Sequence, residues 1–325
     1  MKSATHSAFG DPTELLSLTD SALPEPGPGQ VRIRTILSPI HNHDLVTVQG
    51  QYGYKPDLPA IGGTEAVGIV DALGEGVSGV STGQRVAVAS VHGTWAEYFL
   101  APAAGVVPVP DSVPDEAAAQ MIAMPFSAVM LLEFLGVESC DWVIQNAANG
   151  AVGKMLAMLA GARGINVINL VRRDAGVEEL SALGIRNAVS TAGDDWQNKV
   201  LALTGGAPIR AATDSIGGEA SGDLLSLLGE DGLLVTFGAL TGQPMSLPPG
   251  DLIFKQATVK GFWASKVSAA MPAETRAKLF GELLRMVADG TLKLPVEGIF
   301  PLDRITDAVT AALTPGRNGK VLLKP

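Results

Sequence analysis

Short apolar runs separated by glycine and proline occupy the first third of the chain. Four of these runs are rich in valine, isoleucine or aromatic residues and are bounded by turn residues, which is the pattern of β-strands. We expect strands at residues 31–38, 66–73, 85–89 and 95–100. A mostly β domain is therefore predicted over residues 1–112.

The pattern changes where Pro114 precedes the acidic pair Asp115 and Glu116, which is a typical helix start. Apolar strands and helices alternate from here onward. Strands are expected at 143–145, 166–171, 188–190, 211–214 and 233–237, with helices at 151–163, 177–183, 196–203 and 220–228. Such alternation predicts an α/β fold with a doubly wound parallel Rossmann sheet over residues 113–262. Residues 263–325 hold two more helix patterns and a last strand, which we expect to complete the first domain.

The turn after residues 143–145 carries a glycine pattern typical of dinucleotide-binding sites. Gly150 and Gly153 have the spacing of the last two glycines of that pattern, and Ala148 stands in place of the first. About 20 residues further on, where an NAD site offers an acidic side chain to the ribose, this sequence has Arg172 and Arg173. Because guanidinium groups suit a 2′-phosphate, the pattern predicts NADPH as the cofactor.

Composition excludes several classes of partner. The chain has 33 acidic and 23 basic residues, a net charge of −10, and no long basic run, so nucleic acid and anionic membranes are poor partners. Cys140 is the only cysteine, which excludes an internal disulfide and fits a reducing compartment. No export signal and no long apolar stretch are visible, so we expect a cytoplasmic protein that binds a small-molecule substrate.

Several motifs follow one another over nearly the whole chain. They are VQGQYG (48–53), LPAIGGTE (58–65), IQNAANGAVG (144–153), VRR (171–173), LIFK (252–255) and GFW (261–263). Together they resemble the zinc-free medium-chain dehydrogenase/reductases, closest to the 2-enoyl thioester reductase and ene-reductase branch. The resemblance implies a GroES-like catalytic domain, formed by residues 1–112 and 263–325, with the Rossmann domain of residues 113–262 inserted in it.

Zinc is not expected. A catalytic zinc needs three protein ligands, usually cysteine or histidine, and Cys140 is the only thiol. Thr64 stands where a zinc enzyme of this fold has histidine. His41 and His43 alternate like strand ligands, but we expect them to form hydrogen bonds within a loop that ends in a helix-capping Asp44. Alcohol oxidation is excluded along with the metal.

The resemblance implies hydride transfer from NADPH to an electrophilic carbon. The favoured reaction is reduction of the C=C bond of a 2-enal, enone or 2-enoyl thioester, with hydride adding at Cβ and a proton at Cα. Tyr52, in the QYG motif, corresponds to the proton-donating tyrosine of the enoyl reductases, and a phenol stays protonated at neutral pH. Tyr54 could replace it, or both rings could merely cover apolar surface. Quinone reduction and NADPH binding without turnover stay open as alternatives.

Other site residues follow from the resemblance position by position. Pyrophosphate contacts are expected at Asn149, Gly150, Ala151, Val152 and Gly153; nicotinamide contacts at Phe237, Gly238, Ala239 and Leu240; further cofactor contacts at Phe262, Trp263 and Lys320. Met124 and the segment His41–His43 depart from the family's pattern near the expected cleft, so the size and polarity of the substrate stay open. Residues 257–262 would form an exposed edge strand, which predicts a homodimer.

Overall fold

The chain divides into two units, each with its own core. The computed structural model describes residues 1–325; unit 1 comprises Met1–Ala123 and Leu294–Pro325, and unit 2 comprises Met124–Lys293. These divisions fall later in the chain than the boundaries expected after residues 112 and 262. The parallel sheet of unit 2 and the antiparallel strands of unit 1 confirm the predicted α/β fold class.

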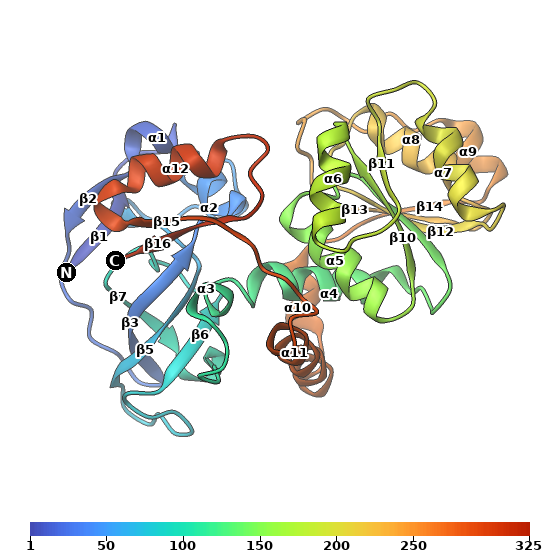
Figure 1. Ribbon diagram of the computed structural model, residues 1–325. Coiled ribbons are helices and arrows are strands. Elements are labelled where there is room, and N and C mark those ends of the chain that lie inside the picture. The colour runs from blue at the N-terminus through green and yellow to red at the C-terminus, as the bar shows by residue number, and fades with distance from the viewer. The chain divides into compact units, whose positions relative to one another are not determined.

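Unit 1 is built on a seven-stranded sheet and a smaller three-stranded sheet (Figure 1). The larger sheet has the order β15-β16-β3-β5-β6-β8, with β7 also paired to β3, and the smaller has the order β2-β1-β4. The strands are β1 (Lys2–His6), β2 (Ser17–Asp20), β3 (Gln30–Pro39), β4 (Ala60–Ile61), β5 (Glu65–Leu73), β6 (Arg85–Ala89), β7 (Tyr98–Pro102), β8 (Val107–Pro108), β15 (Val296–Pro301) and β16 (Lys320–Lys324). The helices are α1 (Pro12–Leu15), α2 (Asn42–Val48), α3 (Asp115–Ala118) and α12 (Ile305–Leu313). Because β16 pairs antiparallel with the end of β3, the end of the chain completes this unit.

Trp95 organises one part of the core of unit 1. Its ring is fully buried and its Nε1 donates to the backbone oxygen of Pro39 at 3.2 Å. Gly62 and Gly63 pack directly against the ring, since a Cβ at either position would overlap it, and Gly63 also has a φ of +90°. The backbone of Trp95 bonds to Ala4 and Gly62, so β7 begins only at Tyr98 and not at the expected residue 95.

Glu65, the first residue of β5, is a fully buried acid that joins separate segments of unit 1. Its Oε1 accepts hydrogen bonds from the backbone N–H groups of Ile122 and Ala123 at 2.8 and 2.9 Å. Its Oε2 lies 2.7 Å from Nε2 of the fully buried His41. Burial raises the pKa of Glu65 to about 7 despite the backbone donors, and burial lowers the pKa of His41 well below its ordinary value.

Unit 2 contains a six-stranded, fully parallel sheet of order β11-β10-β9-β12-β13-β14. Its strands are β9 (Trp142–Gln145), β10 (Asn166–Val171), β11 (Ala188–Ser190), β12 (Ile209–Asp214), β13 (Leu233–Thr236) and β14 (Thr258–Gly261). The helices between them are α5 (Ala151–Ala162), α6 (Asp174–Ala182), α7 (Trp196–Thr204), α8 (Glu219–Leu227) and α9 (Pro249–Phe254). Figure 1 shows α5 and α6 on one face of the sheet and α8 and α9 on the other, which is the doubly wound arrangement.

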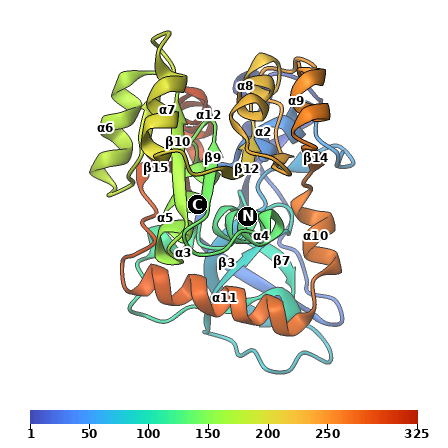
Figure 2. The same ribbon diagram turned by 90° about the vertical axis from the view of Figure 1, so that its right-hand side faces the viewer.

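Three further helices, α4 (Ala123–Leu135), α10 (Ala264–Ala270) and α11 (Ala273–Ala288), complete unit 2. In Figure 2, α11 runs below α4, and the rings of Phe126 and Phe280 stack between them with centroids 4.2 Å apart. Arg163, at the end of α5, forms salt bridges with Glu133 and Glu282. These contacts tie residues 263–293 to the Rossmann sheet, which explains why the second division lies after Lys293 and not after residue 262.

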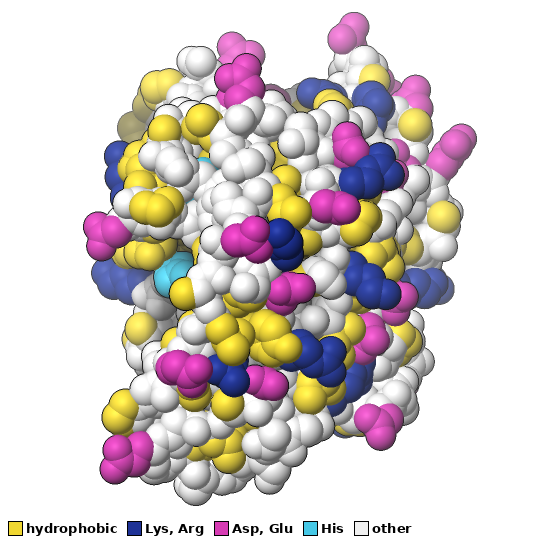
Figure 3. Space-filling view, turned by 90° about the vertical axis from the view of Figure 1, so that its left-hand side faces the viewer, with side chains coloured by type: hydrophobic (Ala, Val, Ile, Leu, Met, Phe, Trp, Pro, Cys, Tyr) yellow, Lys and Arg dark blue, Asp and Glu magenta, His cyan; other side chains and the backbone are white.

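Two surface properties bear on possible partners. Acidic and basic side chains are interspersed on the face shown in Figure 3, and neither sign gathers into one patch. No helix combines the length and the apolar character needed to cross a membrane.

We predict that Glu65→Gln alters the dependence of stability on pH. A raised pKa in the folded state stabilises the protein at low pH, and this contribution is lost as pH rises through about 7. Glutamine keeps an oxygen for Ile122 and Ala123 but cannot titrate. The Tm of the variant relative to the wild type should therefore rise by a few degrees between about pH 5 and about pH 8.

The measurement is thermal unfolding of both proteins across that pH range. Glu75→Gln, which removes the charge of an exposed acid from the same unit, is the matched control and should show no such trend. A Tm difference between Glu65→Gln and wild type that stays constant with pH would contradict the prediction.

Candidate functional site

The turn between β9 and α5 has the backbone of a phosphate-binding loop. Gly150 is the N-cap residue of the 12-residue helix α5, whose N-terminus presents free N–H groups. A Cβ on Gly153 would lie 2.7 Å from the carbonyl oxygen of Ala148, so glycine is required where the helix approaches the strand. The buried Gln145 side chain donates to the carbonyl oxygen of Gly153 at 2.9 Å and fixes the start of the helix.

The predicted pair Arg172 and Arg173 lies at the next strand end. Both side chains are exposed, directly after β10, and Arg173 is the N-cap residue of α6. Neither guanidinium group forms an ion pair or a hydrogen bond within the protein. Their forks are therefore available to a phosphate group, as the sequence pattern predicts.

Sequence reasoning missed a buried polar network at the ends of β9 and β12. Asp214 is fully buried, and its Oδ1 accepts from Asn146 Nδ2 at 2.6 Å while its Oδ2 accepts from Ser221 Oγ at 2.6 Å. The oxygen of the Asn146 side chain in turn accepts from the backbone N–H of Ser215 at 2.9 Å. The signal in the sequence was a polar residue at the carboxyl end of each of two neighbouring parallel strands, where ligands bind in such sheets.

The residues expected at the nicotinamide follow β13 and adjoin this network. A Cβ on Gly238 would lie 3.0 Å from the carbonyl oxygen of Ser215, and the N–H of Leu240 donates to the same oxygen at 3.0 Å. After β14, Phe262 is buried and Trp263 is 63% exposed. The structure thus collects the expected cofactor residues of unit 2 at the carboxyl edge of one sheet, apart from Lys320, which belongs to unit 1.

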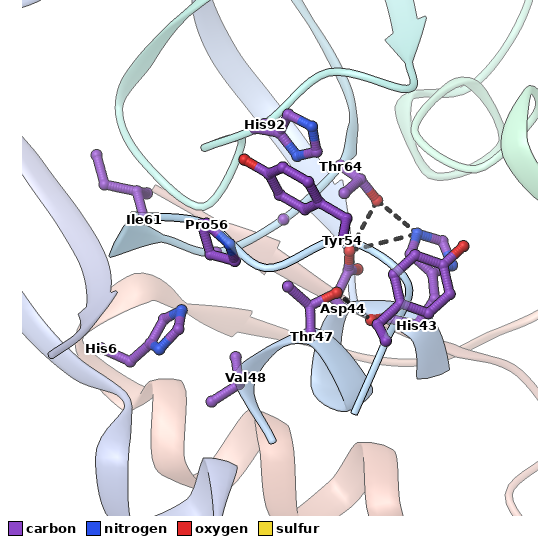
Figure 4. Close-up of a pocket in the computed structure, with 13 residues that line it drawn as sticks. His6, His43, Asp44, Thr47, Val48, Tyr54, Pro56, Ile61, Thr64 and His92 are labelled. Carbon is purple, nitrogen blue, oxygen red and sulfur yellow. Dashed lines mark hydrogen bonds and ion pairs between the residues drawn. The ribbon is translucent and has the colours of Figure 1, made fainter. Parts of the chain in front are cut away.

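A pocket in unit 1 lies beside helix α2 (Figure 4). It contains three of the four histidines of the chain and two of its three tyrosines. The lining residues are His6, His43, Asp44, Thr47, Val48, Tyr52, Tyr54, Pro56, Ile61, Gly62, Gly63, Thr64 and His92. Both candidate tyrosines therefore line one hollow, whose surface is mostly apolar.

Tyr52 occupies the pocket with its ring partly exposed. The centroid of its ring lies 5.7 Å from that of His43, and Tyr54 instead stacks on His92 with centroids 4.2 Å apart. Burial raises the pKa of Tyr52 above its ordinary value, and the negative charge of Asp44 raises it further. The phenol consequently keeps its proton at neutral pH and can donate a hydrogen bond.

The histidine departure noted in the sequence produces two separate contacts. We expected the side chains of His41 and His43 to form hydrogen bonds within their own loop. They bond instead to the segment Thr64–Glu65: His41 contacts Glu65, and His43 Nε2 lies 2.7 Å from Thr64 Oγ1. Asp44 does cap the helix, from inside its first turn, by accepting from the N–H of His41 at 2.9 Å. At the start of α2, the side chain of His41 thus faces the core and that of His43 faces the pocket.

Lys320 begins β16 and is almost fully buried in unit 1. Its Nζ lies 3.4 Å from the backbone oxygen of Ile40, and burial lowers its pKa to about 8. It does not line the pocket. The structure contains no group of three or more His, Cys, Asp or Glu side chains arranged to hold a metal ion.

Two family models match the chain. The one described as "Alcohol dehydrogenase GroES-like domain" matches residues 27–111, and the one described as "Zinc-binding dehydrogenase" matches residues 151–279. The first lies in unit 1 and the second in unit 2. Their order along the chain is that of the architecture expected from the sequence.

Known proteins are similar over the full length. The mitochondrial enoyl-[acyl-carrier-protein] reductase of Bos taurus is 31% identical, and the match covers 99% of this chain and 88% of the relative. A Bacillus thuringiensis protein provisionally assigned as an NADPH:quinone reductase superposes with a TM-score of 0.92 at 30% identity, covering 100% of this chain and 98% of the other. A mycobacterial protein solved in complex with NADPH has a TM-score of 0.88 at 28% identity, covering 100% of both chains.

These similarities agree with the two-unit fold, the phosphate-binding turn and the motifs quoted from the sequence. The similarity to the bovine relative covers nearly the whole of this chain, and both family models describe dehydrogenases. The protein is an oxidoreductase that belongs to the medium-chain dehydrogenase/reductase family.

Proposed function

We propose that the protein uses NADPH to reduce the C=C bond of an α,β-unsaturated carbonyl compound. The observation that carries the proposal is Tyr52, a phenol kept protonated in a pocket whose surface is mostly apolar. Hydride addition at Cβ of such a substrate places negative charge on the carbonyl oxygen. A hydrogen-bond donor at that oxygen stabilises the transition state.

NADPH, when bound, supplies the hydride. The start of α5 and the segment Asn149–Gly153 would hold its pyrophosphate, and Arg172 and Arg173 its 2′-phosphate. Phe237–Leu240, Phe262 and Trp263 lie at strand ends suited to the nicotinamide half. Lys320 is nearly buried in unit 1, so its assignment to the cofactor rests on the family pattern.

The named relatives support two acceptor classes. The bovine relative is an enoyl-thioester reductase and the Bacillus thuringiensis neighbour carries a quinone reductase assignment. We favour the alkene because quinone reduction can take its protons from water and gives Tyr52 no necessary role. An NADPH-binding protein without turnover is the remaining alternative.

The exposed thiol of Cys140 suits a reducing cytosolic compartment.

Tyr52→Phe should lower kcat for reduction of trans-2-hexenal about 100-fold, because the hydrogen bond to the oxygen that becomes negatively charged is lost. The measurement is anaerobic oxidation of NADPH with identification of hexanal as the product. Tyr54→Phe, which removes the hydroxyl of the neighbouring ring stacked on His92, is the matched control and should retain most of the rate. Wild-type protein that forms no hexanal would contradict the proposed reaction.

Replacing Arg172 and Arg173 together by alanine should weaken NADPH binding while leaving NADH binding nearly unchanged. Two charge-assisted contacts to the 2′-phosphate would be lost, and we expect the Kd for NADPH to rise about 100-fold. Titration of the cofactor fluorescence measures both constants. Equal effects on NADPH and NADH would show that the arginines do not bind the 2′-phosphate. Arg186→Ala, an exposed arginine of the same unit, is the control.

We also propose that the protein forms a homodimer through β14. This strand lies at the edge of the sheet, and large apolar side chains beside it are exposed: Phe254 at 84% and Ile253 at 60%. An unpaired edge with such neighbours favours pairing with a second copy.

Light scattering during size-exclusion chromatography should accordingly give twice the chain mass of 33.5 kDa. The double variant Ile253→Asp with Phe254→Asp should shift the protein towards the monomer, since it places charge on the proposed contact. A monomeric wild type at micromolar concentration would reject the dimer.

A further inference from the structure

His43 faces the Tyr52 pocket from the first turn of α2, and its side chain is 25% exposed. Its Nε2 lies 2.7 Å from Thr64 Oγ1, and Thr64 Oγ1 donates to Asp44 Oδ1 at 2.7 Å. Figure 4 shows these contacts as a chain of dashed lines from the imidazole through the hydroxyl to the carboxylate. The carboxylate itself is buried and is held by the N–H of His41.

The number of hydrogens in this chain fixes the state of the imidazole. A threonine hydroxyl has a single hydrogen, and here it is donated to Asp44. Thr64 Oγ1 must then accept its second hydrogen bond, so Nε2 of His43 carries a hydrogen and donates it. Nδ1 has no hydrogen-bond partner in the protein. It is left either with a free electron pair or, in the charged ring, with a second hydrogen.

Asp44 also contacts the ring directly, because its Oδ1 lies 3.4 Å from Nε2 of His43. A carboxylate linked to an imidazole in this way orients the ring. In the charged ring, Nδ1 carries a hydrogen that no group of the protein accepts. Histidine is suited to giving up and regaining a proton near neutral pH, whereas the raised pKa of Tyr52 makes the phenol reluctant to release its own.

We infer that His43 is a second catalytic residue of this pocket, which donates from Nδ1 the proton that each reduction consumes, while Tyr52 holds the carbonyl oxygen. The inference rests on the proposed reduction of an unsaturated carbonyl compound. After hydride has added at Cβ, the Nδ1–H bond breaks as the Cα–H bond forms, and the N–H electron pair stays on Nδ1. The neutral imidazole then takes a proton from water.

Other charged or titratable groups surround His43 on several elements. The ring of His41 stacks on it with centroids 5.1 Å apart, and Tyr52 lies on the loop after α2. His92, on the loop after β6, and Glu65, at the start of β5, both interact electrostatically with it. Lys320, on β16, interacts with His41, Asp44 and Glu65. Of the groups around His43, only Thr64 Oγ1 and Asp44 Oδ1 contact a nitrogen of its ring. These two groups therefore determine how the ring is held.

The first test does not depend on activity. Nitrogen-15 NMR of the full-length protein distinguishes the two neutral tautomers of each imidazole, and the chain has only four histidines. The signal absent from the spectrum of His43→Gln identifies His43. We expect Nε2–H in the neutral ring. A neutral ring protonated at Nδ1 would overturn the inference whatever the protein reduces.

The second test is kinetic and uses His43→Gln, because the glutamine amide can still donate to Thr64 but cannot transfer a proton. We expect kcat with trans-2-hexenal to fall about 100-fold. Added imidazole should restore part of the rate of His43→Ala.

Thr64→Val and Thr64→Ser separate the role of the hydroxyl from that of side-chain volume. Valine has the shape of threonine without the hydroxyl and should lower kcat, whereas serine keeps the hydroxyl and should retain most of the rate. A wild-type kcat in His43→Gln would overturn the inference. Failure of the wild type to form hexanal would instead contradict the proposed function. The NMR test of the His43 tautomer still applies in that case, because it does not depend on the reaction.

Discussion

Burial of the Glu65 carboxylate is the constraint on which the geometry of unit 1 depends. An acid without access to water is stable only where donors surround it, and here the donors come from two distant parts of the sequence. Binding His41 fixes the start of α2, and binding Ile122 and Ala123 fixes the end of the first segment of unit 1. Because Thr64 precedes the acid and His43 follows its partner by two residues, the same interaction brings the pocket's hydroxyl and imidazole together.

Two hydrogen-bonded groups of titratable side chains therefore lie next to each other in different surroundings. The pair of His41 and Glu65 is fully buried, and its pKa values move in the directions that neutralise both groups. The chain of His43, Thr64 and Asp44 opens on the pocket. The two rings stack with centroids 5.1 Å apart, yet His41 is fully buried and His43 lines the pocket. Burial is the main cause of the lowered pKa of His41.

Local patterns in the sequence were enough to predict the parallel sheet, because its central strands β9, β10 and β12 are buried over nearly their whole length. The glycines of the β9–α5 turn and the arginines after β10 were predictable for the same reason: their geometry depends on neighbours within about 30 residues. The partner of His41 was not, since Glu65 and Ile122 are distant in sequence. The attachment of α11 to unit 2 likewise depends on ring stacking and ion pairs that no periodicity reveals.

The two glycines beneath Trp95 constrain how this pocket can change over evolutionary time. Gly62 and Gly63 form part of its wall, and neither can gain a side chain without displacing a fully buried indole ring. Substitution of either glycine is therefore strongly disfavoured. The shape of the pocket can instead vary through Tyr54, Pro56 and His92, none of which is buried, so their replacement costs the core little. Related proteins with different pockets would then share the backbone at Gly62 and Gly63.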